Sequence, residues 1–175
     1  MVPVDRMTAA DVDEIVAAFA ALGWPGKDHE LYDRYLTDQE AGRRETRVAR
    51  VGGRFAGYVT VVWEPDYPPF REAGIPEICD LNVLAGYRNR GLGSALMDAA
   101  EEVIGRRSPV AGLGVGLYAD YGTAQRLYVR RGYLPDGRGL IYRDEIAEPG
   151  TTVRVDDDLL LMMTRELAGA SATRR

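Results

Sequence analysis

Hydrophobic residues recur at helical spacing in two stretches near the N-terminus. In the first, an apolar side chain returns every three or four positions, at Val12, Ile15, Val16, Phe19 and Leu22. Thr8 and Asp11 precede it in the arrangement of a helix-capping pair. The second stretch is shorter, with apolar residues from Leu31 to Leu36, and Gly42 follows it. The pattern predicts two consecutive helices.

The spacing then changes from helical to extended. The runs TRVARV and RFAGYVTVVW flank Gly52-Gly53, and two glycines suit a hairpin turn because glycine adopts positive φ at little cost. We therefore expect an antiparallel pair of strands. Residues 64–76 are rich in proline and are expected to form a loop.

The second half of the chain alternates between the two kinds of pattern. EICDLNVL and VAGLGVGLY predict strands, and AQRLYVRRG predicts a short helix that ends at Gly132. Between the two strands, Leu92, Leu96, Ala99 and Val103 form the apolar face of a longer helix that closes at Gly105. Two further strands are expected at 133–143 and 158–164. The order is strand, two helices, three strands, helix, strand, helix and two strands, which predicts an α/β fold with mixed α+β character.

Composition narrows the class of protein. With 175 residues, 46% hydrophobic and 28% charged, the chain has the size and balance of one soluble globular domain. The net charge of −5 argues against a nucleic-acid partner, and no apolar run approaches the roughly 20 residues that cross a bilayer. The N-terminus lacks the features of a signal peptide, so we expect a cytoplasmic protein. With only Cys79 and His29 of their kinds, we expect no disulfide and no metal site.

The candidate chemistry lies at the junction YRNRGLGSAL, where a strand gives way to a helix. The first amides of a helix have no internal partner and sit at its positive end, so they can bind an anion such as a pyrophosphate. Gly91 and Gly93 would let the backbone approach the anion, and Arg88 and Arg90 add positive charge. The dinucleotide fingerprint fails at Leu96, and a Walker-type Gly-Lys-Ser/Thr is absent. A basic surface turn that merely caps the helix is the alternative.

Two motifs resemble those of one family. DLNVLAGYRNRGLGSAL resembles motif A of the GNAT superfamily of N-acetyltransferases, and TAQRLYVRRGY resembles the motif that follows it. The resemblance covers Glu77 to Tyr133 directly. It implies a single GNAT-like domain over residues 1–167, with a central, mostly antiparallel mixed sheet, splayed middle strands and helices on both faces. Residues 168–175 are expected to form a flexible tail.

The resemblance also implies acetyl-CoA as the acyl donor and a primary amine of a small molecule or peptide as the acceptor. Direct attack in a ternary complex is the implied mechanism. The cofactor-binding residues carried over from the motifs are Leu81, Asn82, Val83, Arg88, Asn89, Arg90, Gly91, Leu92, Gly93, Ser94, Tyr121 and Ala124. Tyr121 stands where many members of the family have asparagine. The alternative function is a CoA-binding sensor without turnover.

Two residues are candidates for catalysis. Tyr128 matches the family tyrosine near the thioester sulfur, where it would protonate the leaving thiolate; core packing is its alternative role. Glu77 occupies the place of the catalytic glutamate of histone-type members, with a solvated carboxylate as its alternative role. Asp80, on the opposite face if the strand alternates regularly, and a chain of waters are the other candidates for the base. A backbone N–H near Leu81 and Asn82 could stabilise the oxyanion.

The partners follow from the same reasoning. We expect an amine-bearing acceptor, neither nucleic acid nor membrane, and a homodimer as one oligomeric state. Trp24-Pro25 and the 64–76 segment are where acceptor contacts are expected. An acyl donor other than acetyl-CoA also stays open.

Overall fold

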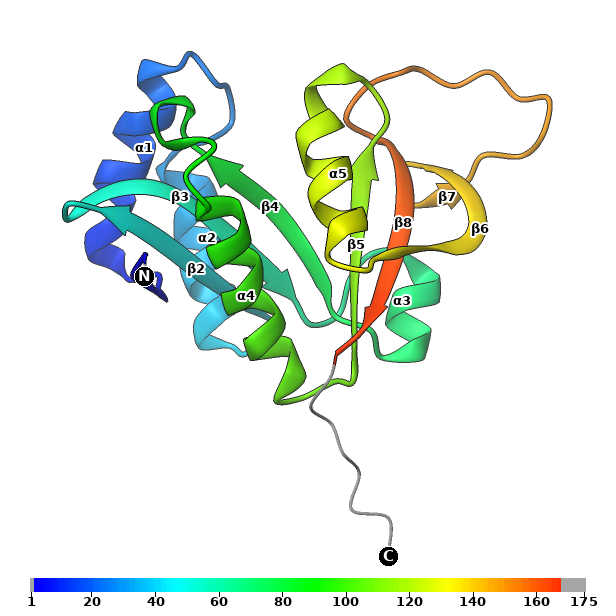
Figure 1. The fold of residues 1–175 in the computed structure, drawn as a ribbon, viewed down its shortest axis with the longest axis horizontal. Coiled ribbons are helices and arrows are strands. Elements are labelled where there is room, and N and C mark those ends of the chain that lie inside the picture. The colour runs from blue at the N-terminus through cyan, green and yellow to red at the C-terminus, as the bar shows by residue number, and fades with distance from the viewer. Residues whose placement is uncertain (1, 168–175) are drawn as a thin grey trace, which may run out of the picture. The chain divides into compact units, whose positions relative to one another are not determined.

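The structure is a computed structural model that describes residues 2–167 (Figure 1). Its helices and strands are, in chain order, β1 Val4–Arg6, the 3-10 turn η1 Ala9–Asp11, α1 Val12–Ala21, α2 His29–Glu40, β2 Arg44–Val51, β3 Arg54–Val62, α3 Pro68–Ala73, β4 Glu77–Val83, η2 Ala85–Tyr87, α4 Leu92–Gly105, β5 Val110–Gly116, η3 Ala119–Tyr121, α5 Gly122–Arg130, β6 Leu134–Tyr142, β7 Glu145–Ile146 and β8 Leu159–Glu166. The expected tail at 168–175 lies outside the described residues.

The strands are hydrogen-bonded in the order β1-β2-β3-β4-β5-β8-β6-β7. The β4–β5 pair is parallel, whereas the β1–β2, β2–β3, β5–β8, β6–β8 and β6–β7 pairs are antiparallel. The mixed, mostly antiparallel sheet with interspersed helices confirms the predicted fold class. The contacts divide the described chain into two compact units, residues 2–63 with 79–102 and residues 64–78 with 103–167.

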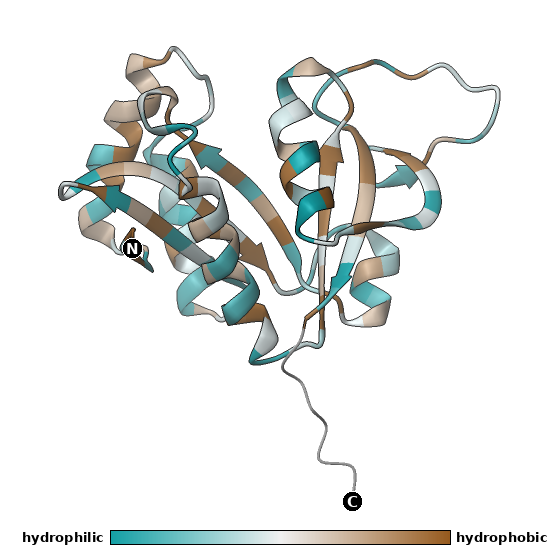
Figure 2. Cartoon of the chain, viewed as in Figure 1, coloured by the Kyte–Doolittle hydropathy of each residue, from teal (hydrophilic) through white to brown (hydrophobic). Residues whose placement is uncertain are grey.

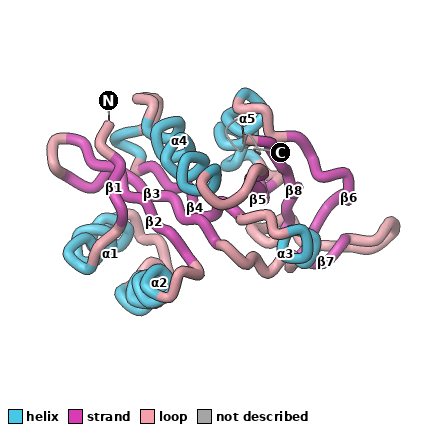
Figure 3. Tube along the Cα trace, turned by 90° about the horizontal axis from the view of Figure 1, so that it is seen from below, coloured by secondary structure: helices cyan, strands magenta, loops and turns pink. Residues whose placement is uncertain are grey.

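The first unit is built on the hairpin of β2 and β3. Gly52 and Gly53, both with positive φ (58° and 78°), form its turn, as the sequence predicts. The helices α1 and α2 cover one face of β1–β3, and α4 lies on the other face (Figure 3). At the start of α1, the Asp11 carboxylate accepts a hydrogen bond from the Thr8 amide at 2.7 Å, which satisfies one amide of the helix entrance.

Aromatic side chains fill the core between α1, α2 and this sheet. Its fully or nearly fully buried rings are Phe19, Tyr32, Tyr35, Phe55 and Tyr58. Phe19 and Tyr32 both meet the ring of Tyr58 edge-on, with centroids 5.9 and 5.8 Å apart. Edge-to-face pairs of this kind contribute about 0.5–1.5 kcal/mol each beyond the area they bury. The core therefore places three tyrosine hydroxyls inside the first unit.

In the second unit, β5 pairs with β8 from Val110↔Glu166 to Gly116↔Leu160. The first two residues of β4 pair with β5 at Glu77↔Gly112 and Ile78↔Leu113. The helices α3 and α5 lie on opposite sides of these strands (Figure 3). Tyr67 and Phe70 pack with Ile141 and Met162 into the core on the α3 side.

The helix predicted from Leu92 to Gly105 is confirmed at those limits. Leu92, Leu96 and Val103 are buried, as its apolar face requires. Brown and teal segments alternate along α4 in Figure 2, which agrees with one buried and one exposed face.

The expectation that residues 64–76 form only a loop is wrong, because they contain α3. Proline tolerates the first turn of a helix, where its missing N–H would have no partner, and Pro68 starts this one. Gly74, in the left-handed conformation with φ 65°, ends it, and Phe70 anchors it in the core. The two-residue strand β7 was also missed, since so short a segment carries no periodic signal.

Candidate active site

The junction between β4 and α4 reverses the chain within eight residues. β4 ends at Val83, η2 follows, and α4 begins at Leu92. Asn89 and Gly91 have φ values of 58° and 80°, and these two left-handed residues turn the backbone into the helix. The Ala95 amide donates to the Gly91 carbonyl at 3.0 Å. The amides of Leu92, Gly93 and Ser94 precede that bond, at the end of the helix where backbone donors lack an intrahelical acceptor.

This helix start suits an anion. The sequence of its first turn, Leu92–Ala95, has no acidic residue that would repel one. A Cβ added at Gly91 would meet no atom within 4 Å, so the space beside the turn is open. Arg88 and Arg90 precede the helix and are exposed. Free amides, a positive helix end and two guanidinium groups therefore gather in one short segment.

The two arginines are held differently. Arg88 donates from Nε to the Val83 carbonyl at 3.1 Å, which ties the turn back to the end of β4. Its remaining guanidinium N–H groups can donate to a ligand, because arginine has five such donors. Arg90 lies over the ring of Tyr87, with its Cζ atom 6.0 Å from the ring centroid. Arg88 thus links the segment predicted to bind pyrophosphate to the segment predicted to bind pantetheine.

The end of β4 runs tightly against β3. The Leu84 amide donates to the Ala56 carbonyl at 2.9 Å, and a Cβ atom at Gly57 would lie 2.4 Å from the Asn82 carbonyl oxygen. Only glycine fits there without displacing β4. The predicted cofactor-binding residues Leu81, Asn82 and Val83 are all half-buried.

Asp80 has a left-handed backbone within β4 and contacts polar side chains from other elements. Its φ of 51° is unusual for a strand residue, so regular alternation does not run unbroken from Glu77. The carboxylate accepts a hydrogen bond from the Tyr35 hydroxyl and forms an ion pair with Lys27 Nζ at 3.2 Å. Lys27 Nζ also donates to the Tyr58 hydroxyl at 2.7 Å. Burial, followed by the charge of Asp80, raises the pKa of Tyr35 and of Tyr58, so both phenols stay neutral.

Sequence reasoning missed Lys27, Tyr35 and Tyr58 as neighbours of Asp80. They come from the α1–α2 connection, α2 and β3, so no local motif joins them. One signal was present. Lys27 is the single lysine of a chain that has 22 lysine and arginine residues in all.

The remaining predicted residues belong to the second unit. Glu77 is half-buried at the first position of β4, paired with Gly112 of β5. Tyr128 of α5 is buried, with 7% of its surface exposed, and its ring lies 6.0 Å from that of Tyr133. Ala124 is half-buried in the first turn of α5. Tyr128 therefore has the packing of a core residue, whatever else its hydroxyl does.

Tyr121 is held by an acidic side chain. Its hydroxyl donates to Asp157 at 2.8 Å, and the Tyr118 hydroxyl donates to the same carboxylate oxygen. Burial and this hydrogen bond raise the pKa of Tyr121, while the two hydroxyls lower the pKa of Asp157. Asp157 thus accepts hydrogen bonds from two tyrosines at the entrance of α5.

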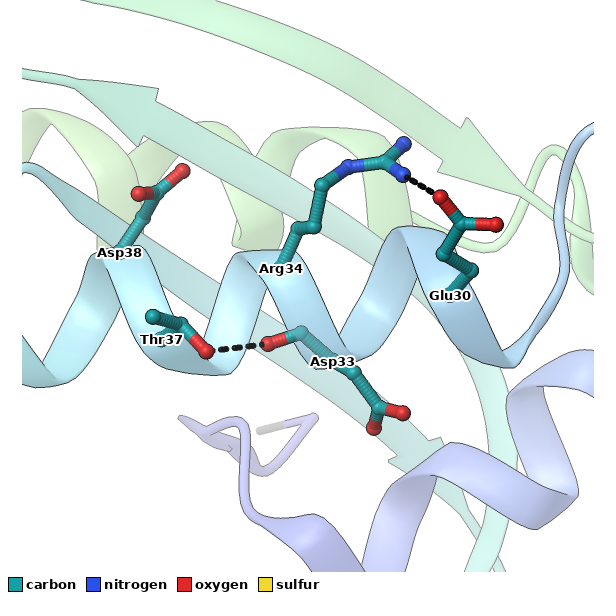
Figure 4. A pocket seen from close by; sticks show the side chains of 5 residues that line it. All are labelled: Glu30, Asp33, Arg34, Thr37 and Asp38. Carbon is teal, nitrogen blue, oxygen red and sulfur yellow. Dashed lines mark hydrogen bonds and ion pairs between the residues drawn. The ribbon is translucent and has the colours of Figure 1, made fainter.

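A surface hollow runs along the exposed face of α2, lined by Glu30, Asp33, Arg34, Thr37 and Asp38 (Figure 4). Arg34 pairs with Glu30 at 2.8 Å, and the Thr37 hydroxyl donates to the Asp33 carbonyl at 2.9 Å. Every lining residue comes from one helix, and the Asp38 carboxylate pairs with Arg43 outside the hollow at 2.7 Å. The hollow has the features of a solvated helix face and contains no predicted site residue.

Other kinds of site were sought in the part of the chain that the structure describes. Among residues 2–167, no group of three or more His, Cys, Asp or Glu side chains could hold a metal ion. No helix in that range is long and apolar enough to cross a membrane. His29 pairs with Asp13 at 2.9 Å on the surface.

The sequence model of the acetyltransferase (GNAT) family matches residues 10–133, which include the whole β4–α4 junction and α5. The chain belongs to the GNAT acetyltransferase family. No curated protein sequence matches it.

Solved GNAT structures share the fold at low sequence identity. A ribosomal-protein-alanine N-acetyltransferase from Brucella melitensis has a TM-score of 0.68 at 20% identity, over 94% of this chain and 99% of that one. An N-acetyltransferase from Staphylococcus aureus gives 0.69 at 15% identity, over 95% and 98%. A GNAT family acetyltransferase from Elizabethkingia anophelis, with acetyl-CoA bound, gives 0.60 at 20% identity, over 95% and 98%.

Proposed function

We propose that this GNAT protein transfers an acetyl group from acetyl-CoA to a primary amine of a small molecule or peptide, by direct attack in a ternary complex. The observation that carries the proposal is the β4–α4 junction, where the amides of Leu92–Ser94 precede the first helical hydrogen bond. A diphosphate is the ligand that such a helix start and two arginines suit best.

The residues present fit that group. The open space at Gly91 admits a ligand against the backbone, and the turn has no acidic side chain to repel it. In the proposed complex, residues Arg88–Ser94 hold the pyrophosphate. Leu81, Asn82 and Val83 hydrogen-bond the pantetheine arm as an added strand would. When bound, acetyl-CoA supplies an activated thioester.

The proposed chemistry assigns one proton transfer to each catalytic residue. The amine nitrogen bonds to the acetyl carbon, the carbon–sulfur bond breaks, and a backbone N–H near Leu81 and Asn82 stabilises the intermediate oxyanion. Glu77 accepts the proton that the amine nitrogen loses, and Tyr128 donates a proton to the departing thiolate. Tyr121 and Ala124, at the start of α5, are proposed to contact the cofactor.

Two of the structural neighbours support the direction of the proposal. The Elizabethkingia protein has acetyl-CoA bound, and the Brucella protein is named for acetylating the alanine of a ribosomal protein, whose acceptor is an amine. At 20% identity these likenesses show the fold alone, so donor and acceptor need their own test.

The test is a transfer assay across acceptor classes. The protein is incubated with acetyl-CoA and a panel of polyamines, arylalkylamines, aminoglycosides and peptides, and the acetylated products are identified by mass spectrometry. Free CoA is followed in parallel against a no-amine control, because Cys79 would itself react with a thiol reagent. Product with any primary amine supports the proposal. CoA-dependent thermal stabilisation with no product from any acceptor or acyl donor would instead support a CoA sensor.

A further inference from the structure

Lys27 is bound in the manner of a ligand. Its ammonium donates to Asp80 Oδ1 at 3.2 Å and to the Tyr58 hydroxyl at 2.7 Å. The same nitrogen lies 5.8 Å from the ring centroid of Phe19 and 5.4 Å from that of Tyr58. A carboxylate, a hydroxyl and two aromatic rings are the groups that proteins use to hold an alkylammonium ion. We call Asp80, Tyr58 and Phe19 the ammonium cage.

Asp80 of the cage is held by two hydrogen bonds and has an unusual backbone conformation. The Tyr35 hydroxyl donates to one carboxylate oxygen of Asp80, and the side-chain Nδ2 of Asn82 donates to the Asp80 backbone carbonyl at 3.1 Å. Asp80 adopts a left-handed conformation that a regular strand does not need. Strain of this kind persists where surrounding contacts impose it, and it concentrates at ligand sites. The backbone conformation of Asp80 therefore sets the direction of its carboxylate, and 29% of the side chain remains exposed.

The identity of the bound residue is informative. Arginine fills every other long cationic position of this sequence, yet the residue in the cage is the one lysine. Structural ion pairs gain more from arginine, whose planar group can form two parallel bonds. A lysine ammonium is instead a compact primary alkylammonium, the same chemical group that the proposed acceptor presents.

We propose that the ammonium cage binds the primary ammonium of the acceptor, and that Lys27 occupies it as an intramolecular stand-in that the acceptor displaces. The role as acceptor site rests on the proposed function. Asp80 of the cage directly precedes Leu81, the first residue of the segment proposed to hold the pantetheine arm.

Competition with Lys27 makes the cage selective among amines. Lys27 lies on the α1–α2 connection, so the chain holds it near the cage at an effective concentration of about millimolar. A small amine with no other contact has to outcompete it. An acceptor with an apolar body can also contact Trp24 on the same connection, which is 42% exposed and packs on Phe19 with ring centroids 5.4 Å apart. The cage therefore favours larger primary alkylammonium ions.

The first experiment observes Lys27 itself. In protein labelled with ¹³C-lysine, the single lysine gives one ε-methylene signal, and n-butylamine should move it, saturably, toward the position of free lysine. n-Butyltrimethylammonium has the same charge but no N–H donor for Asp80 and Tyr58, so it should act at least tenfold more weakly. A signal that does not move, or that moves equally with both cations, overturns the proposal.

The second experiment removes the competitor. Lys27→Ala should bind n-butylamine about tenfold more tightly, because the side chain that competes for the cage is gone. The titration is followed on backbone amide NMR signals, since this variant has no lysine signal. Arg34→Ala, which removes an equally charged residue from the exposed face of α2, should leave the affinity unchanged. Lys27→Ala with Asp80→Asn should abolish binding, and Asn tolerates the left-handed backbone at position 80. Unchanged affinity in Lys27→Ala, or retained affinity in the double variant, overturns the cage.

These readouts need no acetyl-CoA. If the amine binds as described but no acceptor is ever acetylated, the proposed function fails and the cage remains an ammonium site. If acetylation occurs with a KM that neither Lys27→Ala nor Asp80→Asn changes, the function stands and the cage is refuted. A cooperative unfolding transition and an unchanged CoA affinity confirm that each variant is folded.

Discussion

Gly57 of β3 packs directly against the backbone of Asn82 on β4. A methyl group at Gly57 would lie 2.4 Å from the Asn82 carbonyl oxygen and 3.1 Å from the Val83 Cα atom. Backbone atoms cannot rotate away as a side chain can, so β4 itself would have to shift. The glycine therefore sets the position of the strand segment proposed to bind pantetheine.

Gly57→Ala should accordingly lower the free energy of unfolding by about 1–3 kcal/mol, the usual cost of overpacking, and weaken acetyl-CoA binding. Gly86→Ala is the matched control, since a Cβ there meets nothing within 4 Å and lies in the same unit. Urea denaturation and calorimetric titration of both variants test this. Equal behaviour of the two would show that β4 tolerates the displacement.

Gly91 allows the charge at the helix start to be tested without changing its shape. Its φ of 80° makes most substitutions strained, but Asn and Asp both tolerate this region and are nearly identical in size. Gly91→Asp should weaken CoA binding at least tenfold relative to Gly91→Asn, because its carboxylate would face the diphosphate at the positive helix end. The measurement is the CoA Kd of each variant by calorimetry. Equal affinities would exclude the helix start as the diphosphate site.

Tyr128→Phe separates catalysis from packing. If the hydroxyl protonates the thiolate, kcat should fall by about 100-fold while the Kd for acetyl-CoA changes by less than about twofold. Tyr133→Phe makes the same chemical change in the neighbouring buried ring and should leave kcat unaltered. A kcat for Tyr128→Phe equal to that of the wild type would leave Tyr128 as a core residue only.

Glu77 and Asp80 should respond differently in steady-state kinetics. Glu77→Gln removes the proposed base and should lower kcat by about 100-fold with little change in KM. Asp80→Asn removes the anchor of the ammonium cage and should raise the acceptor KM instead. The pH profile of kcat adds an independent readout, since its acidic limb should vanish in Glu77→Gln. The reverse pattern, with the kcat loss at Asp80, would move the base to that residue.

Local patterns in the sequence were sufficient to predict most helices and strands and the position of the β4–α4 junction. The period of apolar residues gave α1, α2 and α4, and Gly52-Gly53 gave the hairpin, because these signals depend on neighbouring residues alone. The exceptions are α3 and the two-residue strand β7. The helix α3 begins with two prolines, which favour a loop in a sequence pattern but also fit the first turn of a helix.

Long-range assembly could not be anticipated in the same way. Tyr58 and Asp80 lie 31 and 53 positions along the chain from Lys27, and no spacing rule relates the three residues. Their meeting depends on the aromatic core that packs α1 and α2 on β3, and on a left-handed residue within β4 that periodicity treats as regular. The composition held the one usable hint, a solitary lysine among arginines.

The buried tyrosines of the first unit predict a loss of stability at high pH. Burial raises the pKa of Tyr32 to about 12 and also raises those of Tyr35 and Tyr58. In the unfolded chain these phenols ionise near pH 10, so above that pH the folded state binds more protons, and the free energy of unfolding falls by about 1.4 kcal/mol per pH unit for each tyrosine. Urea denaturation from pH 9 to 12 measures the slope. Tyr32→Phe should reduce it by one tyrosine's share between pH 10 and 12, and an unchanged slope would mean that Tyr32 ionises as freely in the fold as in the unfolded chain.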